Sequence, residues 1–144
     1  MGYNTSASNG FVNGYIPGSE WQFQNATVFV GAFAANTNLT AKAATAGRKN
    51  VVTDFLISTF AGANAWVPFL FVVDGTTLGA LNANVRWFYQ QGLAINTGDN
   101  YDKTFHPSNP IIMTTNTATG FFCSSGGVAG CAAEVIMRGY QIVG

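Results

Sequence analysis

The sequence is poor in charge. Charged residues make up 8% of its 144 residues, against about 25% in an ordinary soluble domain. The six basic and six acidic side chains cancel, so the chain has no basic patch for nucleic acid and no basic run for a membrane surface. A surface with so little charge promotes association between molecules. We therefore expect a subunit of an assembly that binds neither nucleic acid nor a membrane.

The chain also lacks a clear membrane-spanning segment. Residues 55–73 carry no charge and approach the roughly 20 residues that a spanning helix needs. They include Gly62, Asn64 and Pro68, and the stretch AGANA has the composition of a connection between two apolar runs. Two strands joined by a loop fit this segment better than one helix.

Motifs of common enzymes are absent. The sequence has no G-x-S-x-G elbow, no H-E-x-x-H helix and no glycine loop for phosphate. Asp99 and Asp102 are close enough in sequence to suggest a glycosidase pair, but no groove is evident beside them. His106 is the single histidine. We expect no enzymatic activity, no cofactor and no catalytic residue.

Two cysteines, Cys123 and Cys131, bracket the flexible stretch SSGGVAG. They could form a disulfide in an oxidising compartment if the strands beside them pair. The alternative is two small apolar residues at strand ends. Two cysteines alone do not supply the ligands of a structural zinc site, so no metal is expected.

Short apolar or alternating runs, separated by turn residues, fill most of the chain. Alternation is clear in residues 51–59 and 132–143, and residues 84–90 are rich in aromatic and β-branched side chains. Asp74-Gly75, after the apolar run 67–73, is a strong signal for a short hairpin. No segment has sustained helical spacing. About eight such strands predict an all-β, antiparallel two-sheet β-sandwich domain over residues 19–144.

One polar stretch, residues 92–105, could be mistaken for a site. It contains Asp99 and Asp102 and is followed by His106. Gly98 suits the positive φ of a turn, and the spacing lacks the alternating oxygen ligands of a calcium loop. We expect a structural corner between two strands, without a bound metal.

Residues 1–18 are rich in Gly, Asn and Ser and predict an extended amino-terminal arm. Phe11, Tyr15 and Ile16 are its apolar anchors, and we expect them to form assembly contacts by ordering on a neighbouring subunit.

Aromatic residues could form a platform for sugars or partner proteins, although filling the core is the favoured interpretation. Trp66 lies beside a Gly/Asn loop and is the best candidate for an exposed aromatic contact. The others considered are Trp21, Trp87, Tyr89 and Tyr101.

Four stretches taken in order resemble small tailed-phage virion proteins of the jelly-roll type: LTAKAATAGRKNVVTDFLIST, FLFVVDGTTL, GLAINTGDNYDKTF and AAEVIMRGYQIV. The resemblance covers residues 39–143; the arm and the cysteines lie outside it. It implies jelly-roll topology and a capsid decoration or cement subunit on the virion exterior. The implied partners are other copies, as a homotrimer, and the major capsid or other virion proteins. The alternative is a fibre or tail adhesion module that binds a host-surface glycan or receptor.

Overall fold

The computed structural model describes residues 13–24, 37–61, 65, 67, 69–80, 83–90, 94–124 and 132–144. No helix in this part of the chain is long and apolar enough to cross a membrane. The described residues form these strands: β1 (Trp21–Gln24), β2 (Thr37–Lys42), β3 (Arg48–Phe60), β4 (Phe69–Asp74), β5 (Val85–Gln90), β6 (Asn100–Phe105), β7 (Ile111–Ile112), β8 (Thr119–Ser124) and β9 (Ala132–Val143).

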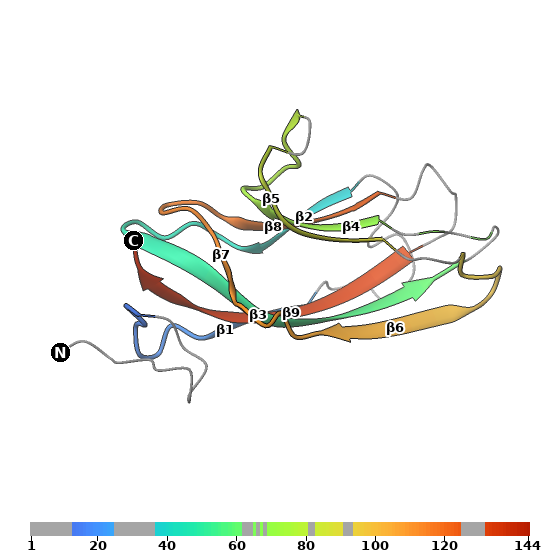
Figure 1. The fold of residues 1–144 in the computed structure, drawn as a ribbon, viewed down its shortest axis with the longest axis horizontal. Coiled ribbons are helices and arrows are strands. Elements are labelled where there is room, and N and C mark those ends of the chain that lie inside the picture. Colours follow the sequence, from blue (N-terminus) through green and yellow to red (C-terminus); the bar gives the residue numbers. More distant parts are fainter. Residues whose placement is uncertain are drawn as a thin grey trace.

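The strands form two antiparallel sheets that lie one over the other (Figure 1). Sheet A has the order β1-β9-β3-β6, with the short β7 also paired to β3, and sheet B has the order β2-β8-β4-β5. Apart from β7, the strands pair from the outside inward: β1 with β9, β2 with β8, β3 with β6, and β4 with β5. This is the jelly-roll arrangement, so the two-sheet sandwich and the jelly-roll topology are both confirmed.

The core lies between the sheets because alternate residues of each strand point inward. Burying an aliphatic or aromatic side chain of this kind contributes about 1.5–3 kcal/mol relative to leaving it exposed. The most deeply buried members are Val52, Phe55, Ile57, Ala61, Leu70, Val72, Met113, Phe121, Val135 and Met137, each at most 2% exposed. Strands β3 and β9 contribute to this core and are also the longest, with 13 and 12 residues.

The corner near Gly98 is confirmed as a turn. Gly98 has φ 83, and the Asp99 N–H donates to the Asn96 carbonyl at 3.0 Å. Strand β6 begins immediately afterwards, and it pairs with β3 along the edge of sheet A. The composition of the stretch therefore reflects the needs of a tight turn.

The expectation of a short hairpin at Asp74-Gly75 is wrong. Strand β4 does pair with β5, but residues 75–84 connect them. Asn84 organises this connection, since its Nδ2 donates to the carbonyls of Asp74 at 2.9 Å and Thr77 at 2.8 Å. Gly75 keeps a positive φ of 127 and its N–H donates to the Ala118 carbonyl at 2.8 Å. Its conformational freedom thus serves a contact with the segment before β8 rather than a two-residue turn.

Candidate functional site

The outer face of sheet B carries a row of phenylalanines. Strand β4 reads FLFVVD, in which Leu70 and Val72 point into the core. Phe71 points the other way, and the strand register places it between Phe88 of β5 and Phe122 of β8. The ring centroid of Phe71 lies 5.8 Å from that of Phe88 and 5.8 Å from that of Phe122. These three residues are called the phenylalanine row below.

An open apolar groove of about 340 Å³ lies along this row, lined by Phe69, Phe71, Val85 and Phe88. None of the lining residues is charged, and Phe88 is 53% exposed. An antiparallel sheet with one face in water normally alternates apolar with polar residues. Sheet B is thus apolar on both faces where β4 meets β5, as is typical of a sheet that is covered on both sides.

The described parts of the connection, residues 75–80 and 83–84, rise above the same face (Figure 1). It is held there by the Leu78 N–H, which donates to Asn38 Oδ1 at 3.1 Å. Asn38 in turn stands opposite Phe122 in the register of β2 and β8. The connection is therefore fastened to β2 on this face, beside Phe122, which is only 8% exposed.

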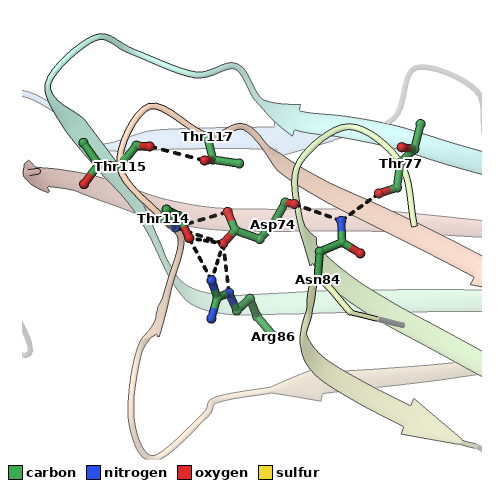
Figure 2. A network of polar contacts seen from close by, with 7 residues as sticks. All are labelled: Asp74, Thr77, Asn84, Arg86, Thr114, Thr115 and Thr117. Carbon is green, nitrogen blue, oxygen red and sulfur yellow. Dashed lines mark hydrogen bonds and ion pairs between the residues drawn. The ribbon is translucent and has the colours of Figure 1, made fainter. Parts of the chain in front are cut away.

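A buried carboxylate fastens the end of β4 to its neighbours. Asp74 accepts hydrogen bonds from Arg86 Nε at 3.0 Å and from the Thr114 N–H at 3.1 Å, and also from Arg86 Nη2 and Thr114 Oγ1 (Figure 2). The Asp74 side chain is 5% exposed and that of Arg86 is 43% exposed. The network links β4, β5 and the segment after β7, and its role is structural.

A second groove, open and of about 460 Å³, lies beside this network. It is lined by Arg86, Trp87 and residues 107–112, among them Ser108 and Asn109. An aromatic ring, a guanidinium group and small polar side chains together form a surface with both apolar and hydrogen-bonding character. This groove has the mixed lining that suits a polar ligand such as a sugar.

The aromatic residues considered from the sequence fill the core wherever they are described. Trp21, Trp87, Tyr89 and Tyr101 are partly buried and pack against the main cluster, which confirms the favoured interpretation for these four. Trp66 lies outside the described residues, so its exposure stays a prediction.

Tyr89 stands at the open edge of this aromatic cluster. Burial raises the pKa of its hydroxyl above the usual 10.0, a hydrogen bond with Tyr101 acts in the same direction, and Lys103 opposes both. Lys103 Nζ lies 4.7 Å from the centroid of the Tyr89 ring. This distance is within the range of a cation–π contact.

The acidic corner shows no assembled site. Asp99 and His106 are exposed, and the exposed Asp102 accepts a hydrogen bond from Ser58 Oγ across β3 and β6. The described residues contain no group of three or more His, Cys, Asp or Glu placed to hold a metal ion. The absence of a metal in the whole chain stays a prediction.

The two cysteines are only partly covered by the structure. Cys123 lies in β8, and Cys131 lies outside the described residues. Their pairing therefore stays open.

The described end of the arm lies on its own subunit. Tyr15 forms a bridge with Ile142 of β9 and packs edge-on against Tyr140, with ring centroids 5.5 Å apart. The Ile16 N–H donates to the Gln141 carbonyl at 3.1 Å. Tyr15 belongs to a small cluster with Val51, Tyr140 and Ile142, separate from the core between the sheets. Phe11 lies outside the described residues, and a contact of the arm with another subunit stays a proposal.

Sequence reasoning missed the phenylalanine row, and it missed that Asp74 is buried and has a structural role. The row does have a signal, because FLFVV and the pair Phe121-Phe122 place apolar residues at consecutive positions. In a strand, consecutive apolar residues mean that both faces are apolar.

No family model matches the chain, and no curated protein matches it in sequence. Among similar solved structures is the infectious bursal disease virus particle, with 12% identity over 87% of this chain and 31% of that chain, at a TM-score of 0.44. The VP2 protein in derived particles of that virus gives 12% identity over 87% and 32%, at a TM-score of 0.36. The present chain thus spans about a third of the length of those proteins. At these identities and scores, the likeness identifies neither a family nor a function.

Proposed function

We propose that this chain is a non-enzymatic structural protein of a virion, and specifically a capsid decoration or cement subunit. It would stabilise the shell from the particle exterior through contacts with other copies and with major capsid or other virion proteins. The observation that carries the proposal is the apolar outer face of sheet B on a jelly-roll domain. The sequence resemblance to phage virion proteins of this type supports it independently.

The physical argument concerns contact area. Removing apolar surface from water contributes roughly 25 cal/mol per Å², so a few hundred Å² per copy contributes several kcal/mol before ordering costs are subtracted. The phenylalanine row offers apolar surface already held rigid by a sheet. The neutral chain supplies little electrostatic steering toward a distant receptor. These properties suit a contact that forms once during assembly and then persists.

The test compares particles with and without this protein. Particles that lack it should release their genome at a lower temperature and should still adsorb to cells. Adding back the purified protein should restore the release temperature. Unchanged thermal release in the depleted particles would rule out a cement role.

The second candidate is an adhesion module on a fibre or tail, favoured by the groove beside Trp87. Its mixed lining, with Ser108 and Asn109 next to an aromatic ring, is suited to the face and hydroxyls of a sugar. In that case the double variant Ser108→Ala/Asn109→Ala should reduce adsorption and leave thermal release unchanged. Normal adsorption of these particles would exclude this groove as the receptor site.

A further inference from the structure

We propose that the outer face of sheet B binds the same face of a second copy of this chain. The β4–β5 part of each face would meet its counterpart across a two-fold axis, with Phe88 of each copy seated in the groove of the other. The inference concerns the isolated protein and does not depend on a role in a virion.

The composition of β4 is the first reason. Phe69, Phe71 and Val73 alternate with the core residues Leu70 and Val72. Val73 is fully buried, Phe69 and Phe71 are half-buried, and Phe88 beside them is 53% exposed. Burial on this face thus falls toward β5. A strand that is apolar on both faces is typical of sheets covered on both sides, and the described residues supply no cover over Phe88.

The shape of the face is the second reason. A protruding ring, Phe88, stands beside the groove that it helps to line with Phe69, Phe71 and Val85. An isologous interface uses the same patch of both copies. Around a two-fold axis, the protruding ring of each copy therefore meets the groove of the other. A knob and a groove on one patch are what such a contact requires.

Charge is the third reason, and it separates a second copy from a charged partner. The residues that line the groove are uncharged, and those that stand opposite Phe69 and Phe122 in the sheet, Gln90, Ser124 and Asn38, are also uncharged. The chain as a whole has a formal net charge of zero. Two copies therefore approach without repulsion, and nothing on the face selects a partner of opposite charge.

The area of the face sets the strength of the contact. The face is open over β4 and β5, which have six residues each, because Phe122 of β8 is only 8% exposed. With strands about 4.8 Å apart and about 3.3 Å per residue, the open footprint is roughly 200 Å² per copy. Stable interfaces bury about 800 Å² per partner. We therefore expect a weak dimer, with a dissociation constant in the micromolar range or above, that high local concentration would favour.

The trimer expected from the sequence resemblance would need a different surface. A closed trimer joins two unlike patches at each contact, which leaves a self-complementary face free. The two contacts are compatible within one assembly, where the face of sheet B would join one trimer to another.

Sedimentation velocity of the purified full chain tests the proposal, from low micromolar to about 1 mM. The wild type should shift reversibly from the 15.2 kDa single chain to twice that mass. Phe88→Lys should weaken the association by more than about tenfold, since it places a charge in an apolar contact. Val143→Lys is the matched control, because Val143 is 64% exposed and lies on β9 of sheet A; it should associate as the wild type does.

Thermal unfolding of each variant verifies the fold, and Phe88→Gln replaces Phe88→Lys if the latter does not fold. A wild type that remains a single chain at every concentration would overturn the proposal, and so would association that survives Phe88→Lys or is lost in Val143→Lys. If the wild type is monomeric but Phe88→Lys no longer binds particles, the shell is the occupant of the face and the self-contact is wrong. That result would leave the cement function intact. A dimer in solution, together with unchanged thermal release of particles that lack the protein, would instead support the self-contact and rule out the cement function.

Discussion

Replacing Asp74 by Ala should destabilise the fold by about 3 kcal/mol. The substitution leaves the Thr114 N–H without its acceptor. An unsatisfied donor costs about 1–3 kcal/mol when it is buried, and the cost here lies at the lower end because this hydrogen bond is only partly buried. The substitution also leaves Arg86 without its carboxylate. Breaking a fully buried ion pair costs about 3–5 kcal/mol, but Arg86 contributes less because its side chain is 43% exposed and can be rehydrated. For a chain of this size, the loss corresponds to a fall in Tm of roughly 10 °C.

The assay is urea unfolding followed by intrinsic fluorescence, with Asp54→Ala as the control. Asp54 also faces an arginine, Arg138, but the two charged groups are 3.8 Å apart and the Arg138 side chain is 60% exposed. Such a surface pair contributes about 0–1 kcal/mol. Asp74→Asn should fall between the two variants, since it keeps one acceptor oxygen. If Asp74→Ala lost no more stability than Asp54→Ala, the Asp74 network would not have the structural role given to it here.

Two further predictions concern a close approach and a titration. Gly139→Ala should lower the free energy of unfolding by about 3 kcal/mol, because an added Cβ would lie 1.9 Å from the Val51 carbonyl oxygen and 2.6 Å from Trp21 Cζ2. In the control Gly98→Ala the added methyl group meets no neighbour, and only the positive φ costs about 1 kcal/mol. Equal losses of the two variants in urea unfolding would contradict this prediction. The raised pKa of Tyr89 means that its neutral form is favoured in the folded state. The contribution of this neutral form to folding stability is therefore complete below pH 10, and it is lost as the pH rises through the folded pKa. Stability should therefore fall more steeply above pH 10 in the wild type than in Tyr89→Phe, and parallel profiles would disprove this.

Local sequence signals predicted the sandwich well, because alternation records which face of a strand is buried. The strand at 132–143 could be predicted from its two-residue alternation of apolar and polar side chains. The turn at Gly98 could be predicted because glycine readily adopts the positive φ that a turn requires. The order of strands within the sheets came from the resemblance, because period alone does not say which strands pair.

The parts that sequence reasoning missed depend on contacts between distant residues. Asp74 follows an apolar run and precedes a glycine, which is the local pattern of a turn. Its burial depends on Thr114, which is 40 residues away, and on Arg86. Tyr15 was expected to serve another subunit, yet it bridges to Ile142 and packs against Tyr140 of its own chain, more than a hundred positions later.

The position of β9 in sheet A affects how this protein can be made. Strand β9 lies between β1 and β3, so neither of those earlier strands has its main neighbour until β9 has been translated and has left the ribosome. Strands β4 and β5 can pair with each other early, although β4 also waits for β8, whereas sheet A waits for almost the whole chain. Long-range pairing of this kind is slow and leaves strand edges open to other chains. Rapid overproduction should therefore yield aggregates, and slower translation or a chaperone that shields nascent strands should favour soluble protein.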